Sequence, residues 1–160
     1  MKVRTRKLLS AAATVAILAA ATSAKAEEAC KGEPGDGAAK LTVEATGLRS
    51  ADGEVAVTVY PNDELRFMAP GGKLARVRTP AVRPATRACF WLPPGAYAVA
   101  IYHDEDGDHA FARDSVGRPA EGFGFSNDAP AARGLPPLSA ARFRLPPGGL
   151  TIRIRMRYLN

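Results

Sequence analysis

Strict alternation of apolar and other residues is the feature that most constrains the fold of this chain. The clearest case is the closing stretch TIRIRMRY, residues 151–158, where every second residue is apolar and arginine fills most of the intervening positions. The same period of two occurs in residues 41–46, 55–59 and 97–101. Because successive side chains of a β-strand point to opposite faces, this period predicts half-buried strands, each with one face toward a core.

Turn chemistry lies between the alternating stretches. Asp52-Gly53 separates two of them, as in a tight hairpin. The sequence LPPG occurs at residues 92–95 and again at 145–148, each time between strand-like runs. Proline presets the first turn dihedral and glycine accepts the positive one. No stretch after residue 26 has the pattern of a long amphipathic helix, so we expect an all-β fold, an antiparallel β-sandwich.

The first 26 residues have the three-part layout of a helical secretory signal peptide. Four basic residues lie between positions 2 and 7, residues 8–21 carry no charge, and Ala24-Lys25-Ala26 fits a small-x-small cleavage site. The alternative is a membrane anchor, which needs roughly 20 apolar residues, more than this run offers. We therefore expect an exported protein of the periplasm or the extracellular space, beginning at Glu27, with no stable membrane span once mature.

Cleavage at this site changes the charge of the protein. The full chain has 22 Lys and Arg against 16 Asp and Glu, a net charge of +6. Five of the basic residues and none of the acidic ones lie in residues 1–26. The remaining chain is close to neutral, so a nucleic-acid partner is not implied.

Two cysteines, Cys30 and Cys89, remain after cleavage. In an exported chain an even pair predicts a disulfide, whereas a metal or redox site is the alternative and no C-x-x-C motif supports it. Closing a loop of about 60 residues would stabilise the fold by roughly 4 kcal/mol. Cys89 shares a strand face with Trp91, so we expect the tethered segment 27–40 to cover that face. The β-sandwich domain then spans residues 41–160.

Four stretches of the chain are similar to a known family: LTVEATGLRSADGEVAVTVY, CFWLPPGAYAVAIYHDEDGD, AEGFGFSNDAP and GGLTIRIRMRY. With them the chain resembles the bacterial secreted family called domain of unknown function 2141, over about residues 41–158. The strand-LPPG-Tyr-strand unit also resembles transthyretin-like and carboxypeptidase-regulatory-like sandwiches. The resemblance implies an Ig-like or transthyretin-like sandwich of about seven strands. It implies no activity, cofactor or catalytic residue.

The stretch YHDEDGDHAF, residues 102–111, is unusually acidic. Asp104, Asp106 and Asp108 stand at i, i+2 and i+4, a spacing that can bring three carboxylates around one calcium ion, with Asp114 as a further ligand. Members of the resembled family often carry a calcium-like loop here, but His109 stands in this chain where a glycine is expected. The loop therefore does not match an EF-hand.

Two other interpretations of the acidic stretch stay open. It can be a solvated turn in which aspartate and glycine satisfy local hydrogen bonds. It can also hold zinc through His103 and His109 together with one of the aspartates.

Residues 104–141 form a long stretch without a convincing strand. Loops longer than about 15 residues are uncommon in compact domains and are often functional. One hypothesis is a ligand-binding loop formed by His103, Phe111, Phe123, Phe125 and Asn127, with aromatic faces for packing and polar groups for orientation. The other is that the phenylalanines fold back and plug one end of the sandwich, beside a short irregular strand near residues 122–125.

The last strand places Arg153, Arg155 and Arg157 on one face. Such a row can bind an anionic partner, such as lipopolysaccharide phosphates or an acidic polysaccharide. It can equally protect a sheet edge from pairing with another molecule.

No catalytic motif is evident. Both histidines lie in the acidic stretch, and no serine lies in a G-x-S-x-G elbow. We therefore expect a non-catalytic binding or accessory protein of the bacterial envelope, contacting an envelope protein or a glycan through the 104–141 loop. The alternatives are a calcium-binding structural module using residues 104–114 and a hydrolase of unknown substrate.

Overall fold

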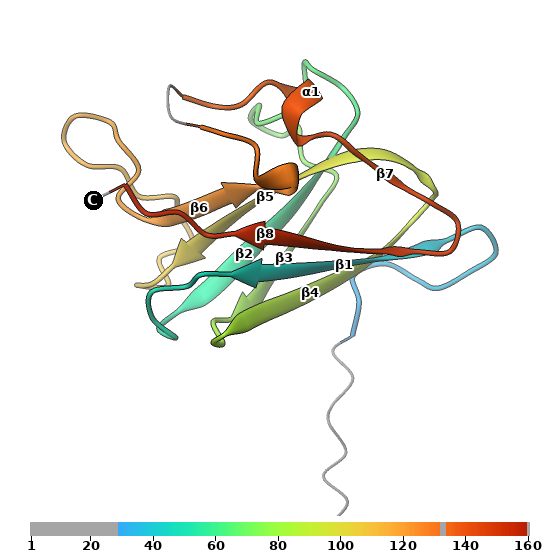
Figure 1. The fold of residues 1–160 in the computed structure, drawn as a ribbon, viewed down its shortest axis with the longest axis horizontal. Coiled ribbons are helices and arrows are strands. Elements are labelled where there is room, and N and C mark those ends of the chain that lie inside the picture. Colours follow the sequence, from blue (N-terminus) through green and yellow to red (C-terminus); the bar gives the residue numbers. More distant parts are fainter. Residues whose placement is uncertain (1–28, 132–133, 160) are drawn as a thin grey trace, which may run out of the picture.

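The computed structural model describes residues 29–131 and 134–159 (Figure 1). The expected signal peptide lies outside these residues. The elements, in chain order, are β1 (Ala39–Thr46), β2 (Glu54–Pro61), β3 (Ala75–Pro80), β4 (Ala85–Leu92), β5 (Gly95–Asp104), β6 (Gly122–Phe125), the 3-10 turn η1 (Ser126–Asp128), the short helix α1 (Leu138–Ala141), β7 (Phe143–Leu145) and β8 (Leu150–Arg155). No helix in the described part of the chain is long and apolar enough to cross a membrane.

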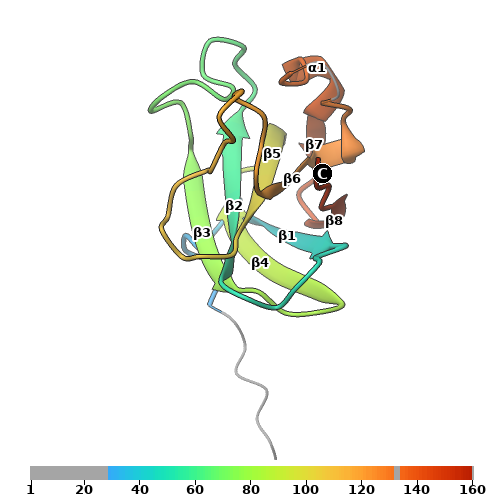
Figure 2. The same ribbon diagram turned by 90° about the vertical axis from the view of Figure 1, so that its left-hand side faces the viewer.

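The strands form two sheets, which confirms the expected β-sandwich (Figures 1 and 2). One sheet has three strands in the order β4-β1-β8, and the other has five, in which β3-β2-β5-β6 are neighbours and β7 also pairs with β5. One pair departs from the antiparallel expectation, because β1 and β8 run parallel, with Leu41 opposite Leu150. Alternation specifies which face of a strand is buried but not the direction of its neighbour.

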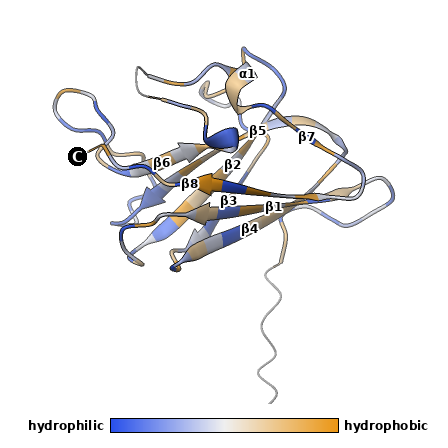
Figure 3. Ribbon diagram, viewed as in Figure 1, coloured by the Kyte–Doolittle hydropathy of each residue, from blue (hydrophilic) through white to orange (hydrophobic). Residues whose placement is uncertain are grey.

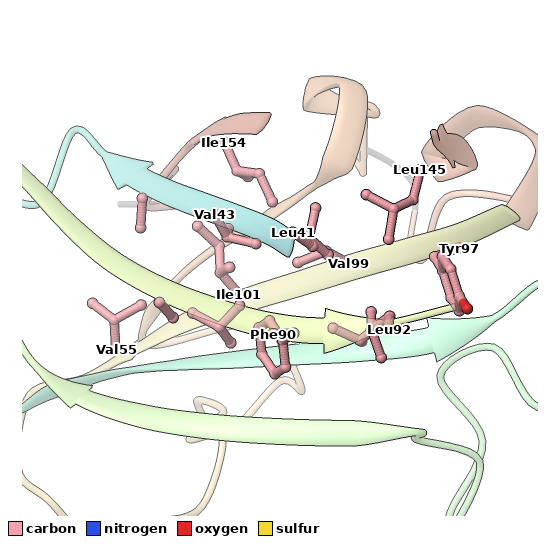
Figure 4. Packing of buried hydrophobic residues seen from close by; sticks show 14 of the residues in the cluster. Leu41, Val43, Val55, Phe90, Leu92, Tyr97, Val99, Ile101, Leu145 and Ile154 are labelled. Atoms are coloured by element: carbon pink, nitrogen blue, oxygen red, sulfur yellow. The ribbon is translucent and has the colours of Figure 1, made fainter. Parts of the chain in front are cut away.

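The main core lies between the two sheets (Figure 4). In β1 every second residue is buried, and hydrophobic and hydrophilic residues alternate along the strand (Figure 3). Leu41, Val43 and Phe90 of the smaller sheet are fully buried, as are Val55 and Val99 of the larger one. Burying such side chains contributes about 1.5–3 kcal/mol each, so this layer supplies most of the driving force for folding.

The five-stranded sheet is buried on both faces. The residues of β2 and β5 are almost all inaccessible to solvent. A second apolar cluster covers the outer face of this sheet, with Tyr60, Tyr102, Phe123, Phe125 and Leu138 among its members. Its cover includes the connection between β2 and β3 and the long stretch after β5. The phenylalanines therefore fold back onto the broad face of a sheet and not onto one end of the sandwich.

The tethered N-terminal segment lies along an edge of the smaller sheet. Cys30 and Cys89 form a disulfide, as expected. The N–H of Lys31 donates to the carbonyl of Cys89 (2.9 Å), and the N–H of Trp91 donates to the carbonyl of Lys31 (2.8 Å). The segment thus extends the sheet at the open edge of β4, where it satisfies backbone groups, and Trp91 stays half-buried.

The sequence GFGF of β6 explains how the long stretch after β5 joins the sandwich. Its phenylalanines point into the outer cluster, whereas its glycines face the end of the chain. A Cβ at Gly122 would lie 2.3 Å from the ring of Tyr158, and one at Gly124 would lie 2.7 Å from the carbonyl oxygen of Arg155. Glycine at both positions lets the C-terminal segment pack directly on β6.

Candidate functional site

A pocket of about 420 Å³ opens on the outer face of the five-stranded sheet. Its floor consists of residues of β2, β5 and β6. Its walls come from Met68 and Arg76, from residues between Phe111 and Pro119, and from Ala131, Gly134 and Leu135. This volume lies within the range of about 300–1,000 Å³ that is usual for small-molecule sites.

The register of the sheet explains the hollow. Arg76, Thr58, Ala100 and Phe125 face one another in that order across four neighbouring strands. The two central side chains are small and the two outer ones are bulky. The alternating stretches of β2 and β5 point their valines and Ile101 into the core, so their outward positions decide the shape of this face. Small outward residues leave a depression that the larger neighbours enclose.

A row of aromatic rings lines the pocket. The centroids of Tyr102 and Phe111 are 5.5 Å apart, those of Phe111 and Phe123 are 6.1 Å apart, and those of Phe123 and Phe125 are 6.1 Å apart, all with edge-to-face geometry. This geometry is favourable for aromatic pairs and holds the rings in place. The three phenylalanines of the predicted ligand-binding loop therefore lie together in one cavity wall.

The charged residues of the lining are all basic. Arg76, Arg113 and Arg118 line the pocket, and among the described residues no acidic one does. Arg118 is neutralised by Asp114, at 2.8 Å. The Nε of Arg76 donates to the hydroxyl of Thr58 (2.7 Å), and Arg113 donates to the carbonyl of Gly117 (2.9 Å). In the described part of the chain, neither of these two guanidinium groups forms an ion pair.

The two polar members of the predicted ligand-binding loop lie elsewhere. His103 is buried, with Nδ1 2.7 Å from the Tyr158 hydroxyl and Nε2 2.8 Å from the carbonyl of Asp52. A carbonyl only accepts, so Nε2 carries the proton and the hydroxyl donates to Nδ1. The side-chain amide of Asn127 donates to the carbonyls of Ala140 (3.1 Å) and Arg142 (2.9 Å). Both residues fasten segments of the fold, and neither lines the pocket.

The residue next to Asn127 has a structural role that the sequence did not reveal. Ser126 is buried in the gap between β6 and β7, which pair with different parts of β5. Its hydroxyl accepts from the N–H of Val99 (2.9 Å) and donates to the carbonyl of Ala141. It thereby satisfies backbone groups that the interrupted sheet edge would leave unpaired.

The acidic stretch after β5 forms a second candidate site. Asp104 is fully buried, and its Oδ2 accepts from Arg78 (2.8 Å) and from the N–H of His109 (3.0 Å). Its Oδ1 is also buried but has no hydrogen-bond partner among the described residues. Buried carboxylate oxygens are almost always partnered, so an orphaned one indicates a missing ligand or water.

Asp106 and Asp108 complete this cluster. Asp104, Asp106 and Asp108 each offer a carboxylate oxygen that lies within 4.8 Å of the others. The predicted fourth ligand, Asp114, is engaged in its own turn, where it accepts from the N–H groups of Val116 and Arg118. The zinc set that pairs the two histidines is not formed, since His103 belongs to neither metal-like group in the described chain.

A further carboxylate lies close to this cluster. Glu121 is buried nearby, and its carboxylate accepts from the N–H of Ala112 (2.9 Å). Burial, followed by the charges of Asp104, Asp106 and Asp108, raises the pKa of Glu121 above its usual value. A cation at the cluster would relieve this repulsion.

Arg78 connects the acidic cluster to the pocket. One of its terminal nitrogens, Nη1, donates to Glu54 (2.6 Å) and Asp104 (2.8 Å). The other, Nη2, donates to the hydroxyl of Tyr102 and to the carbonyl of His109. Arg76 and Arg78 share the outward face of β3. The alternating arginines of the sequence RVR, residues 76–78, are the signal that could have identified these two side chains. The sequence does not tell, however, which strands pair with β3.

The arginine row of the last strand is largely engaged. Arg153 pairs with Glu44 (3.1 Å), which also binds Arg87 (2.8 Å). The side chain of Arg157 donates to the carbonyl of Asp128 (2.7 Å). β8 is the outermost strand of its sheet, so these contacts fit the edge-protection interpretation better than a free anion-binding row.

Fold and site together define a class of protein: a two-sheet β-sandwich with a ligand-sized, aromatic pocket on the outer face of its larger sheet. A family model described as "uncharacterized protein conserved in bacteria (DUF2141)" matches residues 43–153, and the chain belongs to this family. The match runs from β1 into β8, so it includes both sheets and most of the pocket but not Cys30. No curated protein and no solved structure matches the chain significantly.

Proposed function

We propose that this protein is an exported, non-catalytic binding protein of the bacterial envelope that takes up a small, largely apolar ligand in the pocket of its five-stranded sheet. The observation that carries the proposal is the combination of a cavity of about 420 Å³ with a wall of contacting aromatic rings. Sites for small ligands have this composition, with a few polar groups that fix orientation.

The shape of the site favours a small molecule over the envelope protein or glycan considered from the sequence. The described lining has no carboxylate or carboxamide side chain to bind the hydroxyls of a sugar, and most of it is aromatic or aliphatic. A protein partner would be expected to use a broader and flatter surface. The concave site suits a compound with one ring system or one short chain.

The positions of the ionisable groups support a non-catalytic role. His103 is held by hydrogen bonds at both ring nitrogens, and His109 lies 3.3 Å from Glu54, on the side of the acidic cluster. General acid–base catalysis needs such a group within hydrogen-bond reach of the substrate. The pocket lining offers arginines, tyrosines and apolar groups, which bind and orient.

Fluorescence of N-phenyl-1-naphthylamine, a neutral aromatic probe, tests the proposal on the purified mature protein. We expect saturable binding that Ala100→Leu weakens, because the added methyl groups occupy the pocket floor. Ala51→Leu, in the exposed hairpin between β1 and β2, is the matched control and should bind as the wild type does. Absence of binding, or equal binding by Ala100→Leu, would contradict the proposal.

A second candidate function, a calcium-stabilised module, rests on the orphaned Oδ1 of Asp104. Three carboxylates within 4.8 Å of one another can surround a calcium ion, which binds oxygen at 2.3–2.6 Å. The ion would take Asp104, Asp106 and Asp108 as ligands and satisfy a buried oxygen. It would hold the chain that leads to Phe111, and its role would be structural.

Calorimetric titration with calcium, together with melting in calcium or EGTA, tests this candidate. We expect calcium to raise the melting temperature of the wild type but not that of the double variant Asp106→Asn/Asp108→Asn. Asp36→Asn, which removes an exposed carboxylate far from the acidic cluster in the sequence, is the control. No heat and no shift at millimolar calcium would rule the module out.

A further inference from the structure

The pocket has a polar side. Arg76 and Arg113 flank the same pair of contacting rings: the guanidinium carbon of Arg76 is 5.8 Å from the centroid of Tyr102, and that of Arg113 is 5.3 Å from the centroid of Phe111. The two rings are 5.5 Å apart. Two cations from distant parts of the chain thus lie beside one pair of contacting rings in the pocket lining.

Among the described residues, neither of these two cations pairs with a carboxylate. Arg78, Arg87, Arg118 and Arg153 each pair with a carboxylate, as does Arg49. Arg76 and Arg113 donate instead to a hydroxyl and a carbonyl, which leaves further guanidinium N–H groups for a ligand. A guanidinium beside an apolar cavity binds carboxylate, sulfonate or phosphate oxygens through charge-assisted hydrogen bonds.

We infer that the ligand of this pocket is a small organic anion, with an aromatic or short aliphatic body against Phe111, Phe123 and Phe125 and an acidic head group held by Arg76 and Arg113. The inference rests on the proposed function and adds the charge of the ligand and the residues that bind its charged group. A cavity of about 420 Å³ is large enough for one ring system or one short chain.

The test compares two probes that share one ring system, of which only the second carries an anionic group: neutral N-phenyl-1-naphthylamine and its 8-sulfonate. In the wild type we expect the sulfonate to bind about tenfold more tightly, the ratio that one charge-assisted hydrogen bond typically contributes. The double variant Arg76→Gln/Arg113→Gln should lose this preference and bind the two probes with about equal affinity. The control Arg66→Gln/Arg144→Gln removes two exposed arginines outside the pocket and should keep the preference.

The outcomes separate this inference from the proposed function. Equal affinities in the wild type would overturn the inference and leave the proposed function intact, whereas no binding of either probe would overturn both. A preference that persists in the double variant would overturn the assignment to these arginines. Cooperative melting is verified for every variant. If the double variant does not fold, the single variant Arg113→Gln replaces it, because the hydrogen bond described for the Arg113 side chain stays within its own loop.

Discussion

The outer faces of the two sheets differ sharply. The three-stranded sheet carries the half-buried Thr42 and Glu44 on its outer face, and Glu44 is held by Arg87 and Arg153. The five-stranded sheet carries alanines, tyrosines and arginines on its outer face and is covered by two irregular segments that enclose the pocket. The three-stranded sheet thus has one apolar face, which contributes to the core between the sheets. The five-stranded sheet has two apolar faces, of which only the inner one is needed for that core.

The largest effect should come from the shared core. Phe90→Ala empties a fully buried position between the sheets and should lower the free energy of unfolding by about 3–5 kcal/mol. Phe111→Ala, at a half-buried ring of the pocket wall, should cost less than half as much while weakening probe binding more. Urea unfolding and probe titration of both variants measure the contrast. Equal losses of stability would show that the outer cluster is as much a part of the core as the inner one.

Removing the disulfide should affect only the three-stranded sheet. Cys30 and Cys89 are 59 positions apart, so Cys30→Ser/Cys89→Ser should destabilise the protein by about 2–4 kcal/mol. The bond ties a segment to the edge of β4, in the other sheet from the pocket, so probe affinity of the folded protein should not change. A large loss of affinity in the folded variant would mean that the two faces are coupled.

Glu121 makes the pocket-bearing face sensitive to pH. Its pKa is raised in the folded protein, so its contribution to stability is present below the unfolded pKa and is lost as pH rises through the folded value. Glu121→Gln keeps an acceptor for Ala112 and does not ionise. The variant should therefore melt higher than the wild type at pH 7 and lose this advantage toward pH 4, measured in EGTA. An advantage independent of pH would contradict this account.

The smallest effect belongs to the solvated face. Hydrogen bonds from Arg87 and then Arg153 lower the pKa of Glu44, so its stabilising contribution is present at neutral pH and is lost as pH falls through the folded pKa. Glu44→Gln should cost about 1 kcal/mol at neutral pH, and less in high salt, because the two arginines that pair with Glu44 are exposed and such ion pairs contribute little. Thermal melts at two salt concentrations measure it, and a larger or salt-independent loss would count against the contrast between the faces.

Much of the fold could be predicted from residue patterns, and the candidate site only in part. The period of two identified the long strands and the side chains of their buried faces, from Leu41 to Ile154. The short strand of Gly122–Phe125 was foreseen only as an irregular one, and β3 was not anticipated, because its arginines alternate with few apolar residues. Phe111, Phe123 and Phe125, named from the sequence, lie in the pocket lining, whereas its tyrosines were not named. Arg76 and Arg78 were missed, since nothing local relates β3 to a loop that follows β5.

The sequence by itself determined that this chain forms two layers of strands, because alternation and turn residues act over a few neighbouring positions and do not depend on the rest of the chain. Only the tertiary structure decided that β1 and β8 run parallel and that small residues of β2 and β5 lie side by side under a cover of phenylalanines. It alone placed beside them Arg76 and Arg113, which form no ion pair in the described part of the chain. Those features depend on strand order and register, which arise from packing among residues far apart in the chain.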